Sequence, residues 1–182
     1  MPIYIERGNI PRRRHVVYRN EKGEHNYEEH ISRLGFSDIY SNAYHIHMPT
    51  RVAKVGKFRP IKLEEVEGDH RHRHLKTMEL KAEGDWVTGR RVMLFNGDLA
   101  MGTISPVKGQ GGAFYKNATA DEVLFVHRGK GTMESMFGSL KFGEGDYIVI
   151  PRGVIHTVTF DTDENRLFFV ESSGPVDTPH HY

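Results

Sequence analysis

The sequence predicts an all-β protein, a jelly-roll barrel preceded by an N-terminal arm with one short helix. Two observations carry this prediction: short apolar segments separated by turns from residue 43 onward, and a regular spacing of glycine, proline and acidic residues between Gly109 and His156. Many short strands joined by turns are typical of barrels and sandwiches. A chain of 182 residues can bury the core of one such domain. We therefore expect an arm over residues 1–41 and a barrel over residues 42–182.

The arm is polar, and its one regular element is expected to be a helix over residues 27–34, capped by Asn26 and ended near Gly35. Beyond the arm, apolar and polar side chains alternate over residues 44–48, with the period of a half-buried strand. Further strands are expected over residues 91–95, 99–104, 123–127, 131–137, 147–150, 155–160 and 167–171. Glycines at Gly138 and Gly145 are placed where antiparallel strands reverse direction.

Composition excludes several classes of function. Lys and Arg number 25 against 24 Asp and Glu, a balance that gives no reason to expect binding to nucleic acid or to an anionic membrane. Without cysteine the chain has no disulfide, no thiolate nucleophile and no Cys-based zinc site. No apolar run approaches the ~20 residues that span a bilayer, and the N-terminus lacks an apolar signal region. We expect a cytoplasmic protein.

The stretch from Gly109 to Gly129 has a distinctive spacing. A glycine is followed after five residues by Tyr115-x-Asn117, after four more by Glu122, and after six more by a glycine. This register resembles the first motif of the cupins, whose barrel is a double-stranded β-helix. In cupins a His-x-His pair occupies the positions of Tyr115 and Asn117.

A second stretch, from Gly145 to Phe160, resembles the second cupin motif. Gly145 is followed after five residues by Pro151-x-Gly153 and after two more by His156. Phe160 stands where that motif often ends in asparagine. The two stretches together predict the cupin fold more strongly than they predict a metal site.

A cupin metal site uses two histidines at i and i+2, because alternate side chains of a strand share a face. With Tyr115 and Asn117 in those positions, Glu122 and His156 alone remain, whereas a non-haem iron site normally needs two histidines and a carboxylate. We therefore favour a structural Glu122–His156 pair over a metal centre. Tyr115, Asn117, Glu122 and His156 are expected to line the barrel mouth as a candidate ligand-binding site.

Two other histidine patterns admit a metal, but a structural interpretation fits each better. His70, His72 and His74 alternate with arginines and would share one face of a strand. His45 and His47 have the same i, i+2 spacing. A charged surface or subunit contact explains the first pattern, and packing with backbone hydrogen bonds explains the second.

An ordered set of short stretches resembles the N-terminal region of homogentisate 1,2-dioxygenases, and the resemblance covers nearly the whole chain. The stretches are Gly8-Asn9-Ile10-Pro11, Tyr44-His45-Ile46-His47, Arg73-His74-Leu75-Lys76-Thr77, Gly84-Asp85-Trp86, Leu94-Phe95-Asn96, Phe114-Tyr115-Lys116-Asn117-Ala118, Asp121-Glu122-Val123-Leu124-Phe125-Val126-His127, Gly145-Asp146-Tyr147 and Ile150-Pro151-Arg152-Gly153. In that family the Tyr-Lys-Asn segment stands where other cupins carry His-x-His.

The resemblance implies a two-cupin, iron(II)-dependent enzyme of tyrosine and phenylalanine catabolism. Such enzymes use dioxygen to cleave homogentisate to maleylacetoacetate, and their two histidine ligands, glutamate ligand and basic histidine lie in the C-terminal half. No segment before Tyr182 matches that half, so no catalytic or metal-binding role is carried over to this chain. The resemblance thus implies a scaffold barrel, a homo-oligomer and no iron bound by this chain alone.

Two alternatives stay open. The chain could be a stand-alone, metal-free cupin that binds a small carboxylic or aromatic ligand in the barrel mouth, a common place for ligand sites. It could also be a small metal-dependent oxygenase or isomerase that uses Glu122 and His156 with ligands from outside the chain. Chelator sensitivity separates these alternatives.

Overall fold

The computed structural model describes residues 12, 17–37, 40–69 and 71–179, which form two compact units. One unit falls within Ile5–Glu64 and the other within Glu65–Tyr182. The boundary therefore lies at residue 64, whereas the sequence analysis placed it at residue 41. The strand-like alternation around Tyr44 caused this difference, because it belongs to a hairpin of the first unit and not to the barrel.

The first unit contains the antiparallel pair β1 (Tyr27–Ser32) and β2 (Tyr40–His45). The helix expected over residues 27–34 is therefore wrong. An isolated helix of that length is marginal in water, whereas pairing with β2 gives the same backbone groups a ladder of hydrogen bonds. Gly35 has a φ of 61° in the reversal between the strands, so its conformational freedom serves the hairpin.

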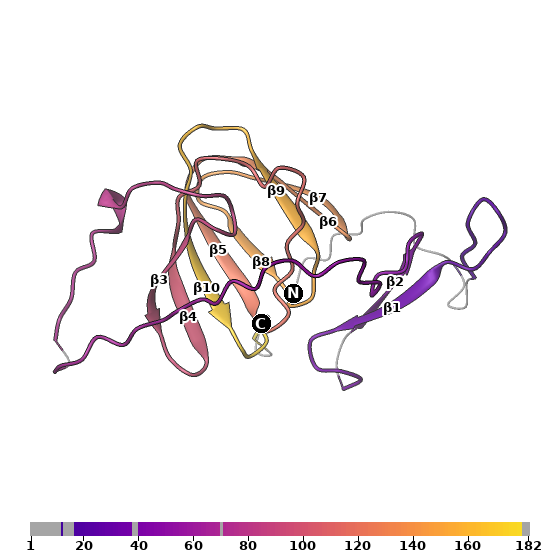
Figure 1. Ribbon diagram of the computed structural model, residues 1–182, viewed down its shortest axis with the longest axis horizontal. Helices are drawn as coiled ribbons and strands as arrows, with labels where there is room; N and C mark the ends of the chain where they lie inside the picture. The colour runs from indigo at the N-terminus through magenta and orange to yellow at the C-terminus, as the bar shows by residue number, and fades with distance from the viewer. Residues whose placement is uncertain (1–11, 13–16, 38–39, 70, 180–182) are drawn as a thin grey trace. The chain divides into compact units, whose positions relative to one another are not determined.

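The second unit is built from two antiparallel sheets (Figure 1). The five-stranded sheet has the order β3-β4-β10-β5-β8 and the three-stranded sheet has the order β7-β6-β9. Their bounds are β3 Arg90–Phe95, β4 Leu99–Ile104, β5 Asp121–Arg128, β6 Gly131–Ser135, β7 Gly138–Phe142, β8 Tyr147–Ile150, β9 His156–Phe160 and β10 Arg166–Ser172. The order places strands distant in sequence side by side, as in a jelly roll. The predicted all-β jelly-roll fold is confirmed.

One strand of the barrel was missed. The sequence analysis placed a turn around Gly138, but β7 begins there and pairs with β6, so that Ser135 lies opposite Gly138. The residues that reverse the chain are Met136 and Phe137. The first four residues of β7 are exposed, so this edge strand lacks the alternation that identifies a half-buried strand.

The core of the barrel fills the space between the two sheets. Its largest fully buried apolar side chains are Trp86, Ile104, Leu124, Leu167 and Phe169. They come from the inward positions of β4, β5 and β10 and from the loop before β3, and each stabilises the fold by about 1.5–3 kcal/mol through burial. This packing fixes the positions of the polar side chains that share the interior.

Among the described residues no helix is long and apolar enough to cross a membrane. The one helical element there is the 3-10 turn η1 (Thr77–Glu79).

Candidate functional site

The structure brings together the four residues that the sequence analysis singled out. Glu122 lies on β5 and His156 begins β9. Tyr115, in the β4–β5 loop (residues 105–120), forms an isolated bridge with His156: each backbone N–H donates to the other's carbonyl, at 2.8 and 2.9 Å. The carbonyl of Asn117 accepts a hydrogen bond from the Gly153 N–H at 2.7 Å. Backbone pairing thus holds this loop against the start of β9.

Glu122 is the centre of this cluster. Its side chain is 1% exposed, and its Oε1 accepts hydrogen bonds from Tyr115 Oη at 3.3 Å and from Asn117 Nδ2 at 3.2 Å. The same oxygen forms an ion pair with Nη1 of Arg90. A buried carboxylate needs such partners, because removing an ionised group from water costs several kcal/mol unless it is paired.

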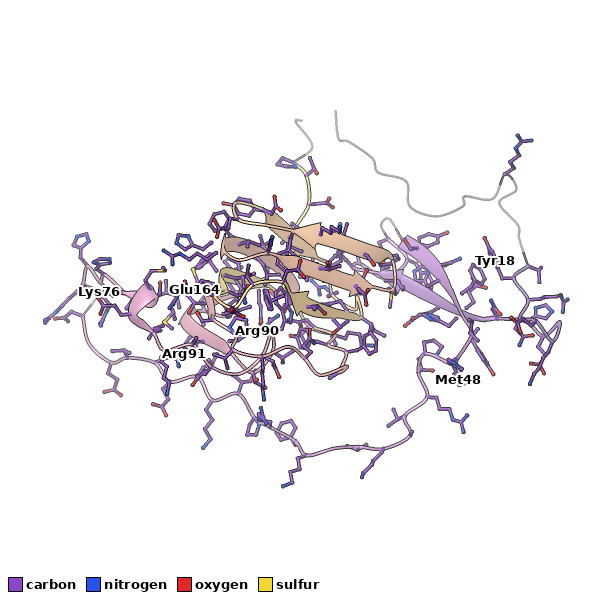
Figure 2. The ribbon with its side chains drawn as sticks, turned by 90° about the horizontal axis from the view of Figure 1, so that it is seen from above. Tyr18, Met48, Lys76, Arg90, Arg91 and Glu164 are labelled. Carbon is purple, nitrogen blue, oxygen red and sulfur yellow. The ribbon has the colours of Figure 1, made fainter. Side chains whose placement is uncertain are left out.

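Arg90 was not predicted as a site residue, yet it organises the cluster. Its side chain is 10% exposed, and Nη1 also contacts Glu171 Oε1 at 2.6 Å. Glu171 lies directly opposite Glu122 on the neighbouring strand β10, where two like charges would repel. Because Arg90 contacts both carboxylates, it offsets this repulsion. In Figure 2 Arg90 lies among the strands of the barrel.

The surroundings keep Arg90 charged and Tyr115 neutral. Burial disfavours the guanidinium, but Glu122, Tyr115 and Glu171 more than offset that effect and raise the pKa of Arg90 above its ordinary value. Burial raises the pKa of Tyr115 to about 12; Arg90 opposes this rise, and the two carboxylates add to it. Tyr115 therefore stays protonated at neutral pH and donates its hydrogen bond to Glu122.

Hydrogen bonding fixes the tautomer of the fully buried His156. Trp86 Nε1 lies 3.3 Å from His156 Nε2, and an indole N–H can only donate, so Nε2 is an unprotonated acceptor. Nδ1 lies 3.1 Å from the Val154 carbonyl, which can only accept, so Nδ1 carries the proton. Burial lowers the pKa of His156, in agreement with a neutral ring.

These residues do not fit the iron site of a cupin. The ring nitrogen of His156 that could bind a metal accepts the Trp86 hydrogen bond, and one oxygen of Glu122 already carries Arg90, Tyr115 and Asn117. Within the part of the chain that the structure describes, no group of three or more His, Asp or Glu side chains could hold a metal ion.

The other histidine patterns do not form a site in the described residues. His72 and His74 are exposed and lie outside any strand, and His70 lies outside the described residues. His45 Nε2 contacts Glu29 Oε2 at 2.8 Å within the β1–β2 pair, and His47 is exposed beyond the end of β2.

A second feature of the barrel is the outer apolar face of its five-stranded sheet. Two cross-strand rows form this face. The first row runs Tyr147, Phe125, Phe168 and Thr103, and the second runs Val149, Val123, Val170 and Met101. Tyr147 is 72% exposed and Phe168 is 42% exposed. Beside Phe125 and Phe168, the face contains a cavity of about 180 Å³, which Met78 of η1 also lines.

The sequence contains a weak signal for Glu171 and none for Arg90. Glu171 shares the inward register of Leu167 and Phe169, so the period of β10 alone places a carboxylate inside. Arg90 precedes the strand expected over residues 91–95, and its inward direction follows from pairing with Ile104, which no local pattern shows.

Comparisons with known proteins give an alignment with part of a curated relative and a limited likeness to solved structures. No protein-family model matches the chain. The chain is 33% identical over 183 residues to a Saccharolobus solfataricus protein named a putative dioxygenase, an alignment covering 100% of this chain and 47% of the relative. The chain thus spans about half the length of the curated relative it matches.

Two solved structures resemble part of this chain. A cupin-2 domain protein from Shewanella frigidimarina is 21% identical, with a TM-score of 0.41, over 49% of this chain and 82% of that one. A Bacillus halodurans protein is 20% identical, with a TM-score of 0.45, over 58% of this chain and 79% of that one. Both TM-scores lie below 0.5, so the fold assignment rests on this barrel's own strand order and pairing.

Proposed function

We propose that this chain is the non-catalytic barrel of a two-barrel, ring-cleaving dioxygenase that acts on homogentisate or a closely similar aromatic acid. Iron(II), dioxygen and the substrate would then bind to the other barrel. The alignment with the Saccharolobus protein supports the class of enzyme, and the ordered resemblance to homogentisate dioxygenases supports the substrate.

The non-catalytic role is supported above all by the contacts that Glu122 and His156 make with other side chains of this barrel. A ring-cleaving iron site must bind substrate and oxygen while its protein ligands hold the metal. In this barrel Arg90 neutralises Glu122, and Trp86 donates to the free nitrogen of His156. Glu122 Oε1 and the free ring nitrogen of His156, which a metal would need, thus already contact other side chains of the chain itself, and these contacts stabilise the barrel.

The outer apolar face supports a scaffold role. Exposed apolar patches of this kind mark interaction surfaces, and β-sheets pack well face to face at about 10 Å. The part of the relative that this chain does not match is about as long as the part it does match, which leaves room for a second barrel. We propose that a second barrel covers this face in the dioxygenase.

Two measurements test the proposal. The chain should be loaded with Fe(II) without oxygen, desalted, and analysed for bound iron and for homogentisate-dependent oxygen uptake. We expect neither from these 182 residues alone. The reading frame beyond the Tyr182 codon should continue into a second barrel with two histidines and a glutamate. Oxygen uptake by this chain alone, or a reading frame that stops at that codon, would refute the proposal.

The face can be tested separately by sedimentation velocity. In the absence of a second barrel we expect the chain to self-associate through the outer apolar face, and Phe168→Lys to reduce that association. Phe114→Lys is the matched control, because Phe114 is exposed in the β4–β5 loop, away from both rows. Equal effects of the two variants would argue against this face.

One observation favours a second candidate function, a metal-free ligand site at the same cluster. Glu122 Oε2 and Arg90 Nη2 are buried and have no hydrogen-bond partner among the described residues. A small polar ligand with a donor and an acceptor would satisfy both atoms. A saturable thermal shift with small carboxylic acids, unchanged by chelator and absent in Glu122→Gln, would support this function.

A further inference from the structure

We propose that the guanidinium of Arg90 is the built-in cation of this barrel, and that its site takes a divalent metal ion when the guanidinium is removed. The inference is independent of the proposed function, because it rests on the geometry of the cluster and not on the kind of enzyme.

Oxygen ligands from separate strands converge on one atom of Arg90. Nη1 contacts Oε1 of Glu122 on β5 and Oε1 of Glu171 on β10, the second at 2.6 Å. Tyr115 Oη lies 3.3 Å from the same Glu122 oxygen. The guanidinium carbon lies 4.9 Å from the centre of the Tyr115 ring, so the phenol and both carboxylates surround one cation.

The charges of the cluster are not balanced by Arg90 alone. Two carboxylates face one guanidinium, while His156 is neutral through its tautomer and Tyr115 is protonated. The cluster therefore carries one excess negative charge. A divalent cation in place of the guanidinium would balance both carboxylates fully.

A second observation points to unused ligand capacity. The Glu122 side chain is only 1% exposed, and its Oε2 atom has no hydrogen-bond partner among the described residues. A metal ion could use both oxygens of Glu122, whereas Arg90 uses one. Carboxylate and phenol oxygens are hard ligands, so they favour Mn²⁺, Mg²⁺ or Ca²⁺ over metals that select imidazole.

The test compares the thermal stability of the wild-type chain and Arg90→Ala, each with and without millimolar Mn²⁺. We expect Arg90→Ala to melt at a lower temperature and saturating Mn²⁺ to raise its Tm by about 5 °C or more. We expect no change for the wild type, with Mn²⁺ or with chelator. Mn²⁺ electron paramagnetic resonance should show bound metal in the variant alone.

Two further variants make the test specific. Arg91→Ala removes an arginine from the next position of β3, where it pairs with Glu83 on the outside, and should not gain a response to Mn²⁺. Adding Glu122→Gln to Arg90→Ala should abolish the response. If Arg90→Ala is insoluble, refolding with Mn²⁺ or methylguanidinium should recover it. Failure of both cations, or an equal response in the wild type, overturns the proposal.

Discussion

The buried pair of Arg90 and Glu122 allows a double-mutant cycle with a sharp expected result. Arg90→Met removes the guanidinium and keeps most of the side chain's length. Glu122 then lacks its cation in a position that is 1% exposed, with hydrogen bonds from Tyr115 and Asn117 alone. Glu122→Leu is the complementary variant, and the double variant replaces both charges with apolar groups.

The structure sets the magnitudes. Removing one partner of a buried ion pair costs about 3–5 kcal/mol, because the other charge stays buried and uncompensated. When Arg90 is removed, Glu171, which is 26% exposed, can turn to solvent. In Glu122→Leu it still contacts Arg90 at 2.6 Å, so we expect that variant to lose the smaller amount, about 3 kcal/mol. Replacing both partners removes the uncompensated charge, and we expect the double variant to lose no more than about 2 kcal/mol.

Urea unfolding of the four proteins measures the cycle. The sum of the two single losses should exceed the double loss, which gives a coupling energy of about 4 kcal/mol or more between Arg90 and Glu122. Unchanged m-values would show that the variants unfold from the same compact state. Additive losses would refute the reasoning, since they would mean that neither side chain depends on the other for its compensation.

Three further predictions concern the buried histidine and the packing of the sheet. Trp86→Phe leaves His156 Nε2 without its donor and should lower the free energy of unfolding by about 1–3 kcal/mol, measured in urea; nitrogen NMR should still show the proton on Nδ1. Gly102→Ala would place a Cβ atom on the Arg91 carbonyl oxygen and should cost about 3 kcal/mol, whereas Gly97→Ala, with open space, should cost less than about 0.5 kcal/mol. Because burial lowers the pKa of His156 below its unfolded value of 6.5, the unfolded chain takes up the proton first as pH falls. The contribution of neutral His156 to the free energy of unfolding is therefore fully present above pH 6.5 and should fall by up to about 1.4 kcal/mol per pH unit below it. In urea titrations at matched pH, His156→Gln should lack this loss.

The barrel could be predicted from the sequence because its strands are short apolar segments separated by turns. The strands β4 and β8 match the expected bounds in full. The first unit could not be predicted in the same way. Tyr27, His30 and Ile31 fit a short helix as well as a strand, and the pairing with β2 that decides between them joins residues outside this local segment, from Ser32↔Tyr40 to Tyr27↔His45.

The candidate site shows the same division. The motif register placed Tyr115, Asn117, Glu122 and His156, and the structure brings all four together. The motif register did not indicate Arg90, because the motif spans residues 109–156 and Arg90 lies on β3, before the motif. A cluster assembled across strands depends on pairing register, which composition and spacing do not encode.

The hydrogen bonds of the β4–β5 loop determine how often this loop opens and lets solutes from the solvent reach the interior. Tyr115 and His156 share two backbone hydrogen bonds, Asn117 accepts a third from Gly153, and the Gln110 side chain accepts a fourth from β9. At about 1 kcal/mol each, their joint loss makes an opened loop rare at equilibrium. Any solute that reaches Glu122 past this loop must wait for that opening, so its association rate would be limited by the motion of the protein and not by diffusion.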